Sequence, residues 1–222
     1  MGADGSRTTL HEFAARHPSA RALQGRGAAY AVTLPQAAAR VVVRHNRHGG
    51  LFGNLTGDLF FAPTRAPLEL EISLELSRLG VPTPDIVAYV VYPPGGVLQR
   101  SDVVSKEIAG GRDLAEILVR DGGPERAAAF AATADLLAAL AKAGARHADL
   151  NAKNVLLTYE TAYVLDVDRV TMGEAPDVAL DANLARLSRS LRKWRDRFGA
   201  RLSERDLTDL QSTARRLALP QQ

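Results

Sequence analysis

The sequence predicts an α+β fold of two lobes, a strand-rich N-lobe with one main helix and a helical C-lobe. Up to about residue 109, short apolar segments alternate with turns and glycine-rich stretches, a pattern typical of strands. Beyond that residue, long Ala- and Leu-rich segments dominate, which favours helices. A chain of 222 residues suits one domain of two small lobes. We therefore expect a single domain over 1–222, with the N-lobe at 20–109 and the C-lobe at 110–222.

The N-lobe begins with a polar, Ala-rich lead-in that has room for a short helix over residues 1–20. Apolar runs bounded by turn residues predict strands at 28–34, 40–44, 86–92 and 97–108. Residues 68–79 alternate like a strand, but their length, their helix-forming residues and the stop at Gly80 favour a helix. Glycines and prolines predict a long loop at 45–67, and long loops in compact domains are often functional.

The C-lobe is expected to be mostly helical. Its apolar periodicity predicts helices at 112–120, 124–143 and, as one or more helices, 178–218. Between the second and third of these segments, two short apolar runs predict a hairpin of strands at 155–158 and 162–166.

Composition excludes several kinds of protein. The net charge of +3 does not indicate a nucleic-acid partner, and the absence of cysteine excludes disulfides and zinc–thiolate sites. No apolar run reaches the roughly 20 residues that span a bilayer, and the N-terminus does not resemble a secretory signal. We expect a cytoplasmic protein, with contact at a membrane surface left open.

The motif at 147–154, His-Ala-Asp-Leu-Asn-Ala-Lys-Asn, is the most informative part of the chain. Asp149 and Asn154 stand five residues apart, and Asp166, at the end of an apolar strand, follows seventeen residues after Asp149. Kinase-like phosphotransferases place a catalytic carboxylate, a metal-binding Asn and a metal-binding Asp in this order and at about this spacing. Asp and Asn are also common as helix caps, but a cap alone does not explain the whole arrangement.

Each of these residue types suits one part of phosphoryl transfer, which requires positioning and neutralisation of phosphate charge. Asp149 would accept the proton of the attacking hydroxyl, and Asn154 and Asp166 would supply oxygens to Mg²⁺, which keeps waters and phosphate oxygens as its other ligands. Lys153 would hold the acceptor or a phosphate oxygen. We expect His147 to brace the loop through hydrogen bonds. The predicted fold is therefore protein-kinase-like, with ATP and Mg²⁺ as cofactors.

Four N-lobe residues are candidates for binding ATP. Gly25 and Gly27 precede the first strand, and glycines let the backbone approach phosphates closely. A kinase normally has a lysine in its third strand, and none of the four lysines of this chain lies where that strand is expected. Arg44 ends the apolar run of valines at 41–43 and would act as the fixed cation, with Glu69 as its helix partner and Glu71 as the second choice. As alternatives, the glycines form a plain turn, and Arg44 and Glu69 are surface charges.

Several motifs together resemble the lipopolysaccharide core kinases, and most closely the 3-deoxy-D-manno-octulosonic acid (Kdo) kinases. The resemblance covers roughly residues 25–195. It is carried by the segments 25–27, 43–51, 69–84, 147–154, 165–169 and 183–191. Protein kinases usually have Lys two residues after the catalytic Asp and Gly two residues after the metal-binding Asp, where this chain has Asn151 and Asp168. The loops at 55–67 and 93–96 are individual to this chain.

The resemblance implies ATP-dependent phosphorylation of a Kdo hydroxyl in the lipid A–Kdo precursor, at the cytoplasmic face of the inner membrane. It implies Asp149 as the base and Asn154 and Asp166 as metal ligands, and it implies no protein partner. The basic stretch 44–48 suits an acceptor with a carboxylate. Further basic residues lie at 186, 189, 192, 193, 195, 197 and 201. They form either a solvated helix face or a surface for an anionic membrane or acceptor.

Two alternatives remain. The first is a heptose or other small-molecule kinase of the same fold, which differs in its acceptor. The second is a catalytically weak, pseudokinase-like scaffold at a membrane surface, favoured by the missing strand lysine. The retained Asp149, Asn154 and Asp166 argue against a scaffold, because a scaffold has no need of a metal site.

Overall fold

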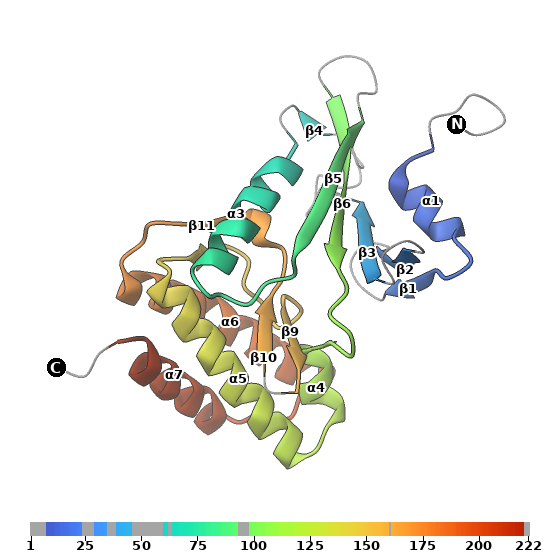
Figure 1. Ribbon diagram of the computed structural model, residues 1–222. Helices are drawn as coiled ribbons and strands as arrows, with labels where there is room; N and C mark the ends of the chain where they lie inside the picture. Colours follow the sequence, from blue (N-terminus) through green and yellow to red (C-terminus); the bar gives the residue numbers. More distant parts are fainter. Residues whose placement is uncertain are drawn as a thin grey trace. The chain divides into compact units, whose positions relative to one another are not determined.

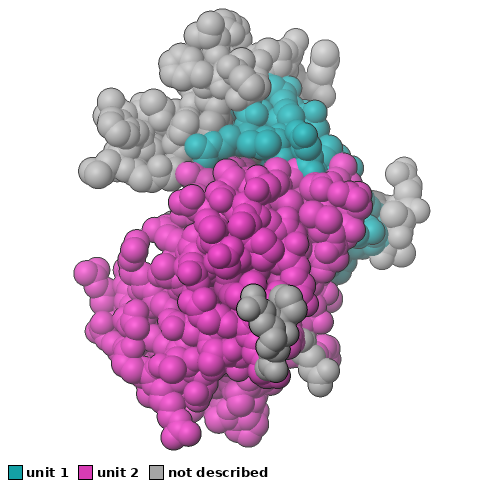
Figure 2. Space-filling view, turned by 90° about the vertical axis from the view of Figure 1, so that its left-hand side faces the viewer, with its two compact units in different colours: residues 1–71, 85–107 teal, residues 72–84, 108–222 magenta. Residues whose placement is uncertain are grey.

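The chain forms two compact units, residues 1–71 with 85–107, and residues 72–84 with 108–222 (Figure 2). A computed structural model describes residues 8–23, 29–34, 39–45, 60–61, 64–92, 98–159 and 161–219. Gly25, Gly27, most of the predicted loop at 45–67 and the predicted turn at 93–96 lie outside the described residues. Each unit is described by itself below.

The first unit is built on an antiparallel sheet of six strands (Figure 1). The strands are β1 (Arg21–Leu23), β2 (Ala29–Leu34), β3 (Ala39–His45), β4 (Phe60–Phe61), β5 (Ile86–Tyr92) and β6 (Leu98–Lys106). Their order is β1-β2-β3-β6-β4, with β5 also paired to β6. The predicted strand at 97–108 is too long at its end by two residues, because β6 ends at Lys106, although the Glu107 N–H still donates to the carbonyl of Arg40 on β3 (2.9 Å).

The buried residues of β3, which alternate along the strand, are part of the core of this unit. Val41 and Val43 are buried between their more exposed neighbours, as expected for a strand with one face covered. They pack with Val104 of β6 and with Ala14 of helix α1 (Leu10–Arg16). Helix α1 starts at Thr9, whose hydroxyl accepts from the N–H of Glu12 while Glu12 accepts from the N–H of Thr9.

A buried carboxylate links α1 to the sheet. Asp102 of β6 has no exposed surface. It accepts hydrogen bonds from the His11 N–H (2.8 Å), the Tyr92 hydroxyl (3.0 Å) and the His45 ring. Burial is the main reason why the pKa of Tyr92 is raised to about 12. This network explains how a charged residue can lie inside the unit, because each contact satisfies an oxygen that water would otherwise solvate.

The second unit is mainly helical. Its helices are α4 (Leu114–Arg120), α5 (Gly123–Lys142), α6 (Pro176–Phe198) and α7 (Glu204–Ala218), and α3 (Ala66–Arg78) crosses from the first unit into it. Helix α5 packs against α6 and α7 (Figure 1). Buried leucines of these helices, with the alanines of α5, form the core. The predicted helical segment at 178–218 is two helices, because Gly199 adopts a φ of 70° and ends α6.

Five short strands complete the second unit. The first sheet has the order β10-β9-β7 and contains β7 (Arg112–Asp113), β9 (Val155–Thr158) and β10 (Thr161–Val164). The other sheet pairs β8 (Arg146–His147) with β11 (Val170–Thr171). The helix predicted at 112–120 begins at Leu114, because the Asp113 carboxylate caps it by accepting from the Glu116 N–H (2.8 Å). No helix among the described residues is long and apolar enough to cross a membrane.

Candidate functional site

The motif residues lie on the loop between β8 and β9 in the second unit. Two main-chain hydrogen bonds tighten this loop, from Leu150 N–H to the His147 carbonyl (3.3 Å) and from Asn154 N–H to the Asn151 carbonyl (2.9 Å). Leu150 and Ala152 are buried in the core. The loop is therefore anchored by apolar side chains, and its polar residues alternate with these anchors.

Asp149 is held through its main chain, which leaves its carboxylate at the surface. Its N–H donates to Nδ1 of His147 (3.1 Å), and its carbonyl accepts from Nδ2 of both Asn151 (2.9 Å) and Asn154 (3.0 Å). The side chain is 38% exposed, and its Oδ1 forms an ion pair with Nη2 of Arg186. The main chain is thus fixed while a carboxylate oxygen stays open to a partner from solution.

Asn154 connects Asp149 to the segment that carries Asp166. Its side chain is buried, and its amide nitrogen is engaged by the Asp149 carbonyl. This bond turns the amide oxygen Oδ1 away from that carbonyl. The main-chain carbonyl of Asn154 accepts from the N–H of Leu165 (2.9 Å), the residue before Asp166. The two predicted metal ligands are therefore joined by the chain segments that bear them.

His147 braces the same two segments. Its Nε2 donates to the Leu165 carbonyl (2.9 Å), and its Nδ1 accepts from the Asp149 N–H, which corresponds to the neutral tautomer with hydrogen on Nε2. Burial of the ring lowers the pKa of His147, although the nearby carboxylates of Asp166, Asp149 and Asp168 act in the other direction. A neutral, buried imidazole with both nitrogens engaged suits a bracing role.

Asp166 lies beyond the strand that was predicted to contain it. Strand β10 ends at Val164, and Asp166 takes a left-handed conformation with a φ of 55° and a ψ of 48°. A 3-10 turn over Val167–Arg169 follows directly. Left-handed backbone is uncommon outside glycine but is tolerated by Asp. The hairpin prediction was therefore too long by two residues, because the chain turns at Asp166 instead of continuing in the sheet.

The donor set fits a magnesium ion bound together with a nucleotide. Asn154 offers an amide oxygen and Asp166 a carboxylate, and both are hard oxygen ligands of the kind that Mg²⁺ prefers. Among the residues that the structure describes, no group of three or more His, Cys, Asp and Glu side chains could hold a metal by itself. A site with two protein ligands leaves the remaining positions to phosphate oxygens and water.

Lys153 has two partners within the second unit. Its ammonium donates to Oδ2 of Asp113, the residue that caps α4 (2.8 Å), and lies 5.3 Å from the ring centroid of Trp194 on α6. The Trp194 ring packs on Phe198 with a centroid separation of 4.4 Å. The prediction placed Lys153 against a phosphate or acceptor oxygen, and the sequence did not indicate either of these partners.

One face of α6 holds the motif loop, and the prediction missed this. Asn183 has no exposed surface, accepts from the His147 N–H (2.9 Å) and donates to the Ala145 carbonyl (2.9 Å). Ser190 accepts from the Ala152 N–H (3.1 Å). Arg186, between them on the helix, reaches Asp149. The spacing of Asn183, Arg186 and Ser190, three and then four residues, is one helical face and was visible in the sequence.

Arg44 and Glu69 belong to the first unit and pair there as expected. Arg44 lies on β3, and its Nη2 donates to Oε1 of Glu69 in the first turn of α3. Glu69 is buried, whereas Glu71, the other helix carboxylate considered for this role, is exposed. An arginine therefore stands in a charge pair where a kinase usually has a lysine.

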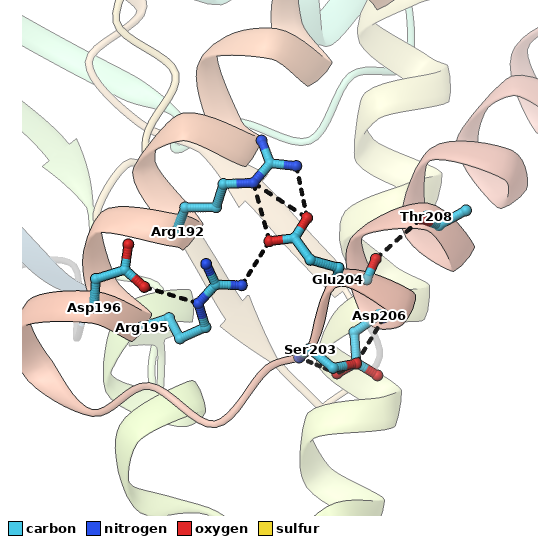
Figure 3. Close-up of polar contacts among 7 residues, drawn as sticks. All are labelled: Arg192, Arg195, Asp196, Ser203, Glu204, Asp206 and Thr208. Carbon is cyan, nitrogen blue, oxygen red and sulfur yellow. Dashed lines mark hydrogen bonds and ion pairs between the residues drawn. The ribbon is translucent and has the colours of Figure 1, made fainter.

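The basic residues of α6 divide into three groups. Arg186 contacts Asp149. Arg192 and Arg195 both bind Glu204 at the start of α7, with closest separations of 2.8 and 2.6 Å (Figure 3). These two guanidinium groups lower the pKa of Glu204 to about 2. The remaining residues are exposed and have no ion-pair partner among the described residues. They are Arg189, Lys193 and Arg197.

A strand-rich unit, a helical unit and an Asp-Asn-Asp arrangement on braced loops together define a kinase-like phosphotransferase. A solved structure titled "WaaP in complex with acyl carrier protein" has the same fold, with a TM-score of 0.50, 21% identity, and coverage of 89% of this chain and 87% of that one. The prediction of a bilobal, protein-kinase-like α+β fold is therefore confirmed.

Curated relatives extend this likeness to the sequence. A 3-deoxy-D-manno-octulosonic acid kinase of Vibrio vulnificus is 32% identical over 192 residues, which is 84% of this chain and 78% of the relative. One from Stenotrophomonas maltophilia is 33% identical over 200 residues, or 87% and 74%. The model of the lipopolysaccharide kinase (Kdo/WaaP) family matches residues 14–213. The chain belongs to this family, which confirms the predicted family and the prediction of a phosphotransferase that acts on an alcohol group.

Proposed function

We propose that the protein transfers phosphate from ATP, with Mg²⁺, to a hydroxyl of Kdo in the lipid A–Kdo precursor. The observation that carries the proposal is Asp149, whose main chain is held by His147, Asn151 and Asn154 while its carboxylate is partly exposed. The curated relatives that bear the name Kdo kinase support this choice of acceptor. We further propose that residues 1–222 act as a single kinase domain.

Each site residue has a role in this proposal. Asp149 accepts the proton of the attacking hydroxyl, and its fixed main chain sets the direction from which that hydroxyl approaches. Asn154 and Asp166 hold Mg²⁺, which when bound neutralises charge on the phosphate oxygens. The amide oxygen of Asn154 is available to the metal because the amide nitrogen donates to the Asp149 carbonyl. His147 stays neutral and keeps the Asp149 and Asp166 segments in register.

The remaining candidates bind ATP. Arg44, oriented by the buried carboxylate of Glu69, supplies a permanent positive charge with a forked set of donors for phosphate oxygens. Gly25 and Gly27 let the backbone approach the phosphates. Lys153 contacts a phosphate or acceptor oxygen in exchange for its contact with Asp113.

Membrane contact is the last part of the proposal. An acceptor built on lipid A lies in a bilayer, so the enzyme acts at the cytoplasmic face of the inner membrane as a peripheral protein. Arg189, Lys193 and Arg197 support this, because they recur every four residues on the exposed side of α6. A lysine or arginine near an anionic surface contributes about 1 kcal/mol to binding.

The experiment that tests the proposal measures transfer of labelled phosphate from ATP, with Mg²⁺, to Kdo-lipid A. A heptose-bearing core acceptor and a reaction without acceptor run beside it. Label on Kdo-lipid A alone is the expected result. Label only on the heptose acceptor would show that the acceptor is a heptose, with the proposed mechanism unchanged. No transfer to either, together with no Mg²⁺-dependent ATP binding, would favour a scaffold.

Two variants assign the roles within the same assay. Asp149→Ala should lower turnover by about 10²- to 10⁴-fold, the range for a lost general base, with ATP binding nearly unchanged. Asp166→Ala should remove Mg²⁺-dependent ATP binding as well. Activity retained by Asp149→Ala, or normal Mg-ATP binding by Asp166→Ala, contradicts the corresponding role.

A further inference from the structure

The guanidinium group of Arg186 forms an ion pair with the proposed catalytic carboxylate of Asp149. Its Nη2 donates to Oδ1 of Asp149, and the side chains are 39% and 38% exposed. Among the described residues, no other side chain donates to the Asp149 carboxylate, so Oδ2 remains for the hydroxyl of an acceptor. A molecule whose hydroxyl meets Oδ2 therefore lies within reach of the same guanidinium group.

The guanidinium retains donors for such a molecule. An arginine side chain carries five N–H donors, and the ion pair with Asp149 involves Nη2 alone. Nε is buried and has no hydrogen-bond partner within the described part of the chain. The exposed remainder of the group faces solution beside Asp149, where it can bind an anion through a charge-assisted, forked contact.

The position of Arg186 is built into the fold. Asn183 and Ser190, on the same face of α6, are hydrogen-bonded to the main chain on either side of Asp149. These bonds fix the distance between the helix and the motif loop, and hence the place from which Arg186 extends. Arg189, about one turn further along, is exposed, and among the described residues no side-chain hydrogen bond or ion pair joins it to this loop.

We propose that Arg186 is a specificity residue that binds the carboxylate of an acidic sugar acceptor while Asp149 receives that sugar's hydroxyl. The inference rests on the proposed function and adds to it the group that recognises the acceptor as a sugar acid. A sugar acid carries a carboxylate and hydroxyl groups on one small ring, so both contacts can form together. A neutral heptose provides no anion for Arg186, and its binding gains nothing from the guanidinium.

The test compares Kdo-lipid A with its carboxyl methyl ester as acceptors for the wild type, Arg186→Met, Arg186→Lys and the control Arg205→Met, which removes an exposed arginine of α7. Arg186→Met should lower kcat/KM for the acid by roughly 10- to 150-fold, the range for a hydrogen bond to a charged group. Esterification should cost the wild type a similar factor and cost Arg186→Met almost nothing. Arg186→Lys should recover part of the loss, and Arg205→Met should stay within about twofold for both acceptors.

The outcomes separate the inference from the proposed function. An equal loss with acid and ester in Arg186→Met would show that the residue only positions Asp149, and would overturn the inference alone. A wild type that does not distinguish acid from ester overturns it too, whether or not the variants fold. If the wild type transfers phosphate to neither acceptor, the proposed function fails, and the inference fails with it. The KM for ATP should be unchanged in Arg186→Met, because the contact lies on the acceptor side.

Discussion

The side-chain nitrogen of Asn154 donates to the main-chain oxygen of Asp149 over 3.0 Å. This bond holds the loop that carries the proposed base, and it orients the amide oxygen proposed to bind Mg²⁺. One buried amide therefore serves both the acceptor side and the metal side of the site. A substitution that keeps an oxygen but removes the N–H donor separates the two tasks.

Asn154→Asp keeps an oxygen ligand but removes the donor. Two acceptors then face each other at a buried position, which should destabilise the protein by about 1–3 kcal/mol. Displacement of the Asp149 loop should lower turnover on the order of 10²-fold. Urea unfolding and turnover in saturating Mg²⁺ check these two effects. Asn151→Asp is the matched control, because Asn151 makes the same contact from a more exposed position and should lose less. Equal, small effects in both variants would contradict the proposed double role.

Asn183→Leu tests the bracing of the loop by α6. Asn183 is fully buried and satisfies the His147 N–H and the Ala145 carbonyl. Leucine has a similar volume but leaves both groups unpaired, at about 1–3 kcal/mol each. Thermal and urea unfolding should show this loss. Ala185→Leu, on the exposed side of the same helix, should leave stability nearly unchanged. A stable, active Asn183→Leu would mean that the loop does not depend on this helix.

The Arg44–Glu69 pair allows a double-mutant test in the first unit. Arg44→Met removes the guanidinium group that donates to the buried Glu69 carboxylate, which should lower the free energy of unfolding by about 1–3 kcal/mol. The double variant Arg44→Met/Glu69→Gln should recover part of this loss, whereas both variants should bind Mg-ATP more weakly than the wild type. Titration calorimetry with Mg-ATP and urea unfolding supply the two readouts. Additive stability losses would show that the pair is not coupled, and unchanged ATP affinity would remove Arg44 from the nucleotide site.

His147 should make stability depend on pH. Burial lowers its pKa below the ordinary 6.5, so the folded protein favours the neutral ring more than the unfolded chain does. This contribution is complete above the unfolded pKa and is lost as the pH falls from about 6.5 through the lower folded pKa, because the unfolded chain then binds the additional proton. Urea unfolding at pH 7.5 and 5.5 should show the decline, and His147→Gln should reduce it. An equal decline in both proteins would assign the effect to other groups.

Glu204→Gln tests the proposed membrane surface. Glu204 binds both Arg192 and Arg195 (Figure 3). Neutralising it removes the ion-pair partner of Arg192 and leaves Arg195 only its ion pair with Asp196, on the helix that carries Arg189, Lys193 and Arg197. Binding to vesicles with anionic lipid should increase, and added salt should reverse the gain. Glu125→Gln removes one negative charge from an exposed position on α5 and serves as the control. An equal increase in the control would point to net charge instead of this helix.

The sequence by itself determined the order and spacing of Asp149, Asn154 and Asp166 and most of the elements around them. Helix α3, predicted at 68–79 and found over Ala66–Arg78, is an example, as is β5, which lies where it was predicted. Such features are local, because periodicity, stop signals and motif spacing act within a few turns of chain.

Only the tertiary structure decided which side chains meet across long separations. Arg186 reaches Asp149 from 37 residues away, and Lys153 reaches Asp113 from 40. The sequence marked Arg186 only as one of several basic residues on a helix. Whether such a residue faces solvent, a carboxylate or a membrane depends on how the helix packs, and packing depends on the shape of the whole core. The left-handed turn at Asp166 lies between two such contacts, the hydrogen bond from the Leu165 N–H to the Asn154 carbonyl and the pairing of β11 with β8.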